Sequence, residues 1–185
     1  MSAKRQKIAE ALDALEADRE ALTAELNQLS DEQLSFSTHP DVWTIHQVYC
    51  HMALAEQLLL FHVAEKELQG NAKSPKGSRG LRDKVAFGFM RMFFAVGIPV
   101  KAPTKSVIPP VEPPPLSHLG PKWAEMRGVI RQWIEGMDDE RLQAPIVRHP
   151  FAKMDVANAL QFARWHFDRH RKQIQRLQKQ PGFPT

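Results

Sequence analysis

Apolar residues recur every three or four positions over long stretches, and this periodicity limits the fold of the chain more than any other feature. In the first stretch only Arg19 interrupts the apolar series, and charged residues occupy the opposite side. Such spacing is typical of a helix that buries one face. The sequence predicts that this helix ends near Ser30, with a buried stripe of Ile8, Leu12, Leu15, Leu22, Leu26 and Leu29.

A second helix is predicted to begin after a loop over residues 34–43. Thr44 can serve as its N-cap, and Gln47 three residues later completes a capping box. The helix is expected to end at about Gln69, where Gly70 and Asn71 follow. Its apolar stripe consists of Ile45, Val48, Met52, Ala55 and Leu59.

Two further helices are predicted in the second half of the chain. Pro121 suits the first position of one of them, whose buried stripe is Trp123, Met126, Ile130, Trp133 and Met137. After a loop through Pro150, Asp155 can cap the last helix, which Pro181 and Gly182 end. Its stripe is Val156, Leu160, Ala163, Phe167, His170, Ile174 and Leu177. Four such helices predict an all-α, antiparallel four-helix bundle.

The middle of the chain departs from this pattern. Residues 73–80 are expected to form a polar loop, and Val85–Val100 is an apolar stretch with Arg91 as its one charge. We expect an accessory helix there that covers the bundle or makes a dimer contact; a membrane-surface anchor is the alternative. Residues 101–121 contain seven prolines, so regular structure is not expected there. The length of the segment predicts an ordered wrap around the bundle or an arm. Residues 1–185 are predicted to form a single domain.

Length and composition exclude several classes of protein. A chain of 185 residues can bury a core without disulfide staples, and the single cysteine, Cys50, excludes an internal disulfide and a multi-cysteine zinc site. The N-terminal residues lack the apolar run of a signal peptide, and no stretch approaches the ~20 apolar residues of a transmembrane helix. We therefore expect a cytoplasmic protein. The net charge of +4 does not by itself indicate a nucleic-acid partner.

Three histidines are the candidate functional residues. His170 occupies a position of the apolar stripe that Leu or Ile would otherwise fill, and His166 lies four residues earlier, on the same face of the helix. An i, i+4 pair of histidines is a common helical clamp for a metal ion. His51, at the edge of the buried face of the second helix, is the candidate third ligand.

The other histidines are weaker candidates. His46 lies in the first turn of its helix, where a polar residue is ordinary. His62 lies three turns from His51, ~16 Å along the helix, too far to share an ion with it. His118 and His149 are placed in loops, where either could line the mouth of a pocket.

Two segments resemble the DinB/YfiT-like superfamily. The first is Trp43-Thr44-Ile45-His46-Gln47-Val48-Tyr49-Cys50-His51, with Glu56 and Gln57 after it; the second is His149-Pro150-Phe151 followed by His166, His170 and Gln173. They resemble the start of the second helix and the last helix of that superfamily. The long proline-rich segment departs from its smallest members.

The resemblance implies a four-helix bundle with one divalent metal ion, most often zinc or nickel, bound by His51, His166 and His170. Several relatives transfer low-molecular-weight thiols such as bacillithiol, mycothiol or glutathione, and many have no known activity. The resemblance therefore favours a thiol-dependent S-transferase or detoxification enzyme acting on a small molecule. That activity follows from the resemblance and not from any spacing in this chain.

The residues themselves leave other functions open. An ion bound by three neutral histidines can lower the pKa of a bound water or bind a thiol as its thiolate. A metal-dependent hydrolase and a non-enzymatic, stress-related metal-binding bundle are the alternatives. The sequence identifies no catalytic side chain. Gln173 lies on the ligand face, where it is either a residue that orients a ligand or bound water or an ordinary half-buried polar residue. A di-iron carboxylate site is excluded because the chain contains no Glu-x-x-His pair.

Overall fold

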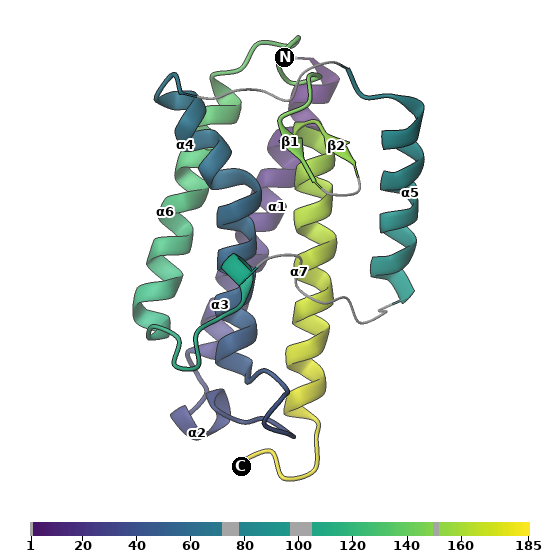
Figure 1. The fold of residues 1–185 in the computed structure, drawn as a ribbon. Helices are drawn as coiled ribbons and strands as arrows, with labels where there is room; N and C mark the ends of the chain where they lie inside the picture. The colour runs from purple at the N-terminus through teal and green to yellow at the C-terminus, as the bar shows by residue number, and fades with distance from the viewer. Residues whose placement is uncertain (1, 72–77, 97–104, 150–151) are drawn as a thin grey trace.

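Four long helical rods lie side by side in the computed structural model and confirm the predicted all-α bundle (Figure 1). The structure describes residues 2–71, 78–96, 105–149 and 152–185. Two rods run in one direction, α1 (Ala3–Leu26) and α7 (Val156–Gln178), and two run in the other. The latter are α6 (Leu116–Glu135) and a rod made of α3 (Ile45–Glu56), the π-helical turn η1 (Gln57–Phe61) and α4 (His62–Leu68).

The predicted caps define where several rods begin and end. Thr44 and Gln47 form the reciprocal capping box at the start of α3, and the Asp155 side chain accepts a hydrogen bond from the amide of Asn158 at the start of α7. Gly70 ends α4 with a positive φ of 70°, a conformation that glycine adopts without steric cost. The stripes predicted for α6 and α7 are buried throughout.

The first half of the chain differs from prediction in three places. Helix α1 ends at Leu26 and not near Ser30, because Ser30 instead caps a short helix, α2 (Asp31–Leu34), in a capping box with Gln33. Arg19, expected as a gap in the stripe, is buried and bonds Glu16. On α3 nearly all sides are buried, because the rod contacts α6, α7 and the 3₁₀ turn η2 (Lys105–Val107).

The second half of the chain also differs from the prediction, at the start of α6 and in the loop before α7. Pro121 is not the first residue of α6, which begins five residues earlier, after Pro115. Burial of Leu116 favours the earlier start, and so does a close approach at Gly120, where an added Cβ would lie 3.1 Å from the Thr23 side chain. The predicted loop before α7 contains a small hairpin of β1 (Val147–Arg148) and β2 (Lys153–Met154). Residues 101–121 are therefore partly regular, in η2 and the first turn of α6.

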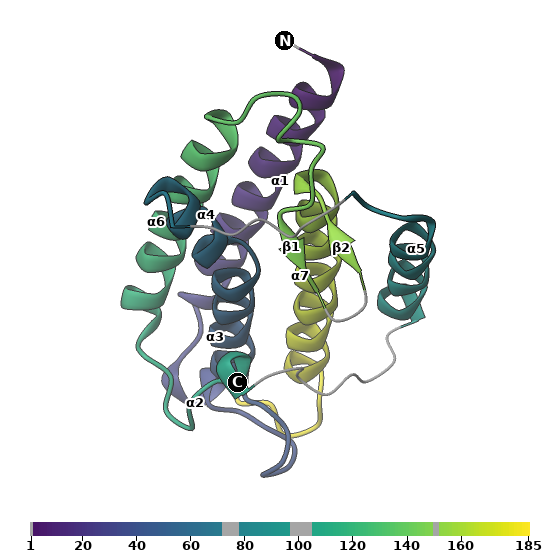
Figure 2. The ribbon, with the colours of Figure 1, turned by 45° about the horizontal axis from the view of Figure 1, so that its top comes forward.

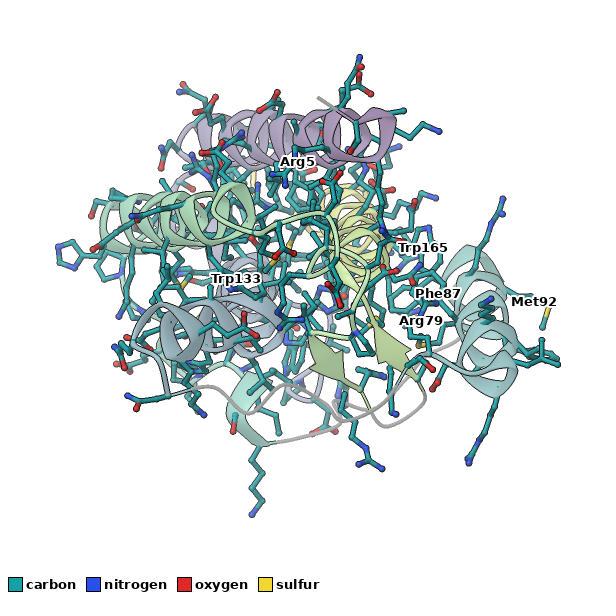
Figure 3. The ribbon with its side chains drawn as sticks, turned by 90° about the horizontal axis from the view of Figure 1, so that it is seen from above. Arg5, Arg79, Phe87, Met92, Trp133 and Trp165 are labelled. Atoms are coloured by element: carbon teal, nitrogen blue, oxygen red, sulfur yellow. The ribbon has the colours of Figure 1, made fainter. Side chains whose placement is uncertain are left out.

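Helix α5 (Leu81–Val96) lies outside the four rods, beside α7 (Figures 1 and 2). It begins four residues before its predicted start, and residues 97–100 of the predicted helix lie outside the described residues. Seen from above, Phe87 and Trp165 face each other between α5 and α7, whereas Met92 points away from the bundle (Figure 3). No helix in the described part of the chain is long and apolar enough to cross a lipid bilayer.

Candidate metal centre

The structure brings together the three histidines singled out in the sequence. His51 extends from α3, and His166 and His170 extend from successive turns of α7, the rod that packs against α3. One nitrogen from each ring lies within 4.8 Å of the others. The Nε2 atoms of His51 and His166 are 3.2 Å apart, and the ring centroids of His51 and His170 are 4.6 Å apart.

Two hydrogen bonds fix which ring nitrogens face one another. The Nδ1 atom of His51 donates to the backbone carbonyl of Val107, at 2.6 Å, and Nδ1 of His170 donates to Oε1 of Gln173, at 2.9 Å. Since each Nδ1 carries its proton toward an acceptor, Nε2 of each neutral ring retains a free lone pair. Histidine ligands of metal ions are usually oriented by such an outer hydrogen bond.

Burial keeps the three rings neutral. It is the largest cause that lowers the pKa of His51, and it lowers the pKa of His170 to about 3, with a further contribution from His51. The pKa of His166 is well below its ordinary value because the ring is buried and faces His170 and His51. All three therefore present lone pairs at neutral pH, the state that a metal ion requires of its histidine ligands.

This donor set fits a divalent ion that prefers nitrogen. Two nitrogens bound to one tetrahedral zinc ion lie roughly 3.3 Å apart, close to the 3.2 Å between the Nε2 atoms of His51 and His166. The group contains no Cys, Asp or Glu, so the three histidines would leave the charge of the ion uncompensated. Zinc and nickel both bind imidazole well.

Aromatic side chains surround the cluster. The Trp43 ring lies 4.7 Å from the His51 ring, and Phe162 stacks parallel to His166 with centroids 6.4 Å apart. Phe94, from α5, lies 5.3 Å from Phe162 and 6.5 Å from His166. Apolar neighbours of this kind lower the local dielectric constant, which strengthens electrostatic interactions inside the site.

The proline-rich segment lies across the start of α3 and completes the site (Figure 1). Besides the bond from His51 to Val107, His46 Nε2 lies 2.8 Å from the carbonyl of Pro114. The Gln47 side chain donates to the carbonyls of Pro110 and Val111. The described part of this segment is thus the ordered wrap that the sequence predicted, and His46 holds it in place.

A hollow of about 220 Å³ lies near the C-terminal end of α7, lined by Gln173, Arg176, Thr38, Val42, Leu177 and Gln180. Its connection to the cluster is Gln173, whose side chain also bonds His170. Arg176 and Arg169 lie on the same face of α7 as Gln173, because these positions are separated by three and four residues. Neither arginine has a carboxylate partner among the described residues, whereas Arg164 and Arg171 of the same helix pair with Asp18. Burial and the nearby Arg176 lower the pKa of Arg169.

The remaining candidate histidines lie apart from the cluster. His62 is half-exposed beside Glu65. His118, predicted in a loop, is instead an exposed residue in the first turn of α6. His149 does lie in a loop, and its ring is 5.1 Å from Phe162, so it approaches the aromatic wall without joining the cluster.

Several residues of the site carried no recognisable signal in the sequence. Val107 contributes through its backbone carbonyl, so its side chain gave no indication of this role. Phe94 and Phe162 read as ordinary apolar helix residues, and their meeting at His166 depends on the packing of α5 against α7. The i, i+7 spacing of Arg169 and Arg176 could have placed both on the ligand face, but it could not show that neither has a carboxylate partner among the described residues.

The comparisons with known proteins identify the family of the chain. No curated protein and no solved structure matches it. A family profile described as the DinB superfamily matches residues 14–174, which include all three histidines and the whole segment between them. The family predicted from the two sequence segments is confirmed: this chain belongs to the DinB superfamily.

Proposed function

We propose that this protein is a divalent-metal-dependent enzyme that transfers a low-molecular-weight thiol to an electrophilic small molecule. The metal ligands are the Nε2 atoms of His51, His166 and His170. The observation that carries the proposal is the convergence of three neutral imidazoles, two buried and one half-buried, whose lone pairs face one another. Structural zinc sites usually have four protein ligands, so a set of three favours an ion that also takes part in chemistry.

The bound ion would lower the pKa of a thiol so that the sulfur is a strong nucleophile at neutral pH. The other roles belong to residues of the chain. The Val107 carbonyl and the Gln173 side chain hold two of the imidazoles in place. The walls formed by Trp43, Phe94 and Phe162 exclude water and provide an apolar surface for the electrophile.

Arg169 and Arg176 favour a thiol over water as the nucleophile. Arg176 lines the hollow that reaches Gln173, and Arg169 lies about two turns earlier on the same face of α7. Neither has a carboxylate partner among the described residues, so both suit the carboxylate of an acidic thiol. Such a thiol would place its sulfur toward the histidines and its carboxylate toward the arginines. The sulfur then forms a bond to an electrophilic carbon, and the leaving group departs with the electron pair of the broken bond.

Turnover by the zinc-loaded and nickel-loaded protein tests the proposal. An electrophile such as chlorodinitrobenzene is offered with glutathione, bacillithiol or mycothiol, and the product is measured with and without metal. The proposal expects product only when both a thiol and the metal are present. Metal-dependent cleavage of an ester or amide without any thiol would instead identify a hydrolase. Absence of all turnover in the loaded protein would favour a non-enzymatic metal-binding bundle.

A further inference from the structure

The outer face of α5 is an apolar stripe that no described part of the chain covers. Leu81, Val85, Phe89 and Met92 follow one another at intervals of three and four residues and lie on one side of the helix. Between 51% and 78% of each residue is exposed. We call these four residues the outer stripe. A contiguous exposed apolar stripe of this kind marks a surface that meets another molecule.

The opposite face of α5 is attached to the bundle, so the helix cannot rotate to bury the outer stripe. Met90 is buried, and Phe87 lies 5.0 Å from Trp165 of α7 (Figure 3). Just before the helix, Arg79 donates to the carboxylate of Asp155, the residue that caps α7. The outer stripe is therefore a stable feature of the surface and not the exposed side of a loosely packed helix.

Positive charges border the outer stripe on both sides. With a turn of 100° per residue, Arg82 falls on one edge of the stripe, and Lys84 and Arg91 fall on the other. Asp83, which is the one acidic residue of α5, accepts a hydrogen bond from the amide of Lys153 in the hairpin and another from the amide of Gly80, just before α5. The outward side of α5 thus combines apolar residues with cations and presents no carboxylate of its own.

We propose that the outer stripe and its bordering cations dock this protein onto the surface of an anionic lipid membrane, with α5 lying parallel to that surface. Amphipathic helices bind in this way when apolar residues enter the boundary between headgroups and acyl chains and basic residues meet lipid phosphates. Charge complementarity favours this occupant over a second copy of the chain. Two outer stripes packed together would bring Arg82, Lys84 and Arg91 of both copies to one interface without a carboxylate from α5 to pair with them.

Co-sedimentation of the full chain with vesicles tests the proposal. One set of vesicles contains phosphatidylcholine alone, and the other contains phosphatidylcholine mixed with phosphatidylglycerol. We expect binding to the anionic vesicles that weakens as salt is added and little binding to the neutral ones. The double variant Phe89→Ser/Met92→Ser should bind at least roughly tenfold more weakly. The triple variant Arg82→Gln/Lys84→Gln/Arg91→Gln should lose roughly a hundredfold, about fivefold for each cation.

Matched variants separate the outer stripe from general charge and hydrophobicity. Lys7→Gln/Lys66→Gln/Lys122→Gln removes the same number of exposed cations elsewhere, and Leu68→Ser removes an exposed apolar residue from α4. Both controls should retain binding, and circular dichroism should show all variants folded. Failure to bind anionic vesicles, or equal binding by the outer-stripe and control variants, overturns the proposal. A concentration-dependent dimer that dissociates in the Phe89→Ser/Met92→Ser variant would also overturn the proposal, because the outer stripe would then bind a second copy of the chain.

Discussion

Gln173 accepts a hydrogen bond from His170 through its side-chain oxygen, with 2.9 Å between Oε1 of the glutamine and Nδ1 of the histidine. The two residues lie one turn apart on α7, so the helix itself fixes the contact. The same glutamine lines the hollow that Arg176 also lines. Gln173 therefore connects the orientation of a proposed metal ligand with the place where we expect the thiol to bind.

Removal of this bond should weaken metal binding without abolishing it. Gln173→Ala leaves His170 free to rotate and to change its tautomer, and the loss of such an outer contact typically costs ~10–100-fold in affinity. Competition for zinc against a chromogenic chelator measures the change. Gln175→Ala, at an exposed position on the same helix, is the control and should bind as the parent does. Equal affinities of the two variants would mean that Gln173 has no orienting role.

Each of the three histidines should be essential for stoichiometric metal. His51→Ala, His166→Ala and His170→Ala each leave two nitrogen donors, too few to hold a divalent ion tightly in competition with water. His62→Ala, on the same rod as His51 but outside the cluster, should retain full occupancy. Elemental analysis of protein purified without chelator reports the metal content. One metal ion per chain in the His166→Ala variant would contradict the assignment.

The metal-free protein should lose stability as the pH falls below about 6.5, the ordinary pKa of histidine. The pKa of His170 in the fold is about 3, so between these values the unfolded chain binds a proton that the folded chain does not. The free energy of unfolding should decrease by roughly 1.4 kcal/mol per pH unit for each fully buried histidine of this kind. Above a pH of about 6.5 the ring is neutral in both the folded and the unfolded chain. The free energy of unfolding then no longer depends on pH through this histidine.

Urea unfolding of chelated protein near neutral and mildly acidic pH measures this slope. His170→Gln removes the titrating ring and should reduce the dependence of stability on pH. His62→Gln changes a half-exposed ring outside the cluster and should leave the dependence as it is. An unchanged slope in His170→Gln would show that acid destabilises the protein through other groups.

Arg169 and Arg176, which have no carboxylate partner within the described ranges, should matter for thiols that carry a carboxylate and not for uncharged thiols. Arg169→Gln and Arg176→Gln are expected to raise KM for glutathione by roughly tenfold or more, since a charge-assisted hydrogen bond contributes about 1.5–3 kcal/mol. Turnover with the uncharged thiol 2-mercaptoethanol should change little. Lys172→Gln, which removes the same charge from an exposed position of α7, is the control. Equal losses with both thiols would assign the arginines to stability and not to recognition of the carboxylate.

Removal of the metal should leave the bundle folded. Large side chains from all four rods, including Leu22, Ile45, Trp123 and Leu160, are almost fully buried without any contribution from an ion. Each contributes roughly 1.5–3 kcal/mol of hydrophobic stabilisation. Circular dichroism of chelated protein should therefore retain its helical signal and a cooperative thermal transition, with a modest decrease in Tm. Loss of the helical signal on chelation would identify a structural ion and weaken the proposed enzymatic function.

A helix or strand could be predicted from the sequence when the residues that determine it lie within that helix or strand or next to it. The start of α7 and its buried stripe were predicted, because the stripe lies within the helix and the Asp155 cap directly precedes it. Helix α6 was predicted from its stripe, but its start was not, because burial of Leu116 against the rest of the bundle prevailed over the preference of Pro121 for a first turn. The two-residue strands of the hairpin are too short to produce an alternating pattern.

The metal centre likewise has a part that local spacing predicts and a part that depends on how the helices pack. The spacing of His166 and His170 placed both on one helical face, and a local pattern suffices for that. His51 approaches these two histidines because α3 packs against α7. Spacing along the sequence could not establish this packing. The spacing made His51 a candidate third ligand, and the family resemblance supported that choice. The capping box of Ser30 and Gln33 was available in the sequence, and α2 could have been predicted from it.

The acceptor that orients His51 is a main-chain carbonyl, and every amino acid offers the same carbonyl. Side-chain substitution at Val107 can therefore change packing without removing the acceptor. The path of the chain from Val107 to Pro114, whose carbonyl contacts His46, sets where that acceptor lies. An insertion or deletion between these residues would displace it even if every contacting side chain were retained. The segment from Val107 to Pro114 thus constrains the site through its length, and its side chains can be substituted more freely.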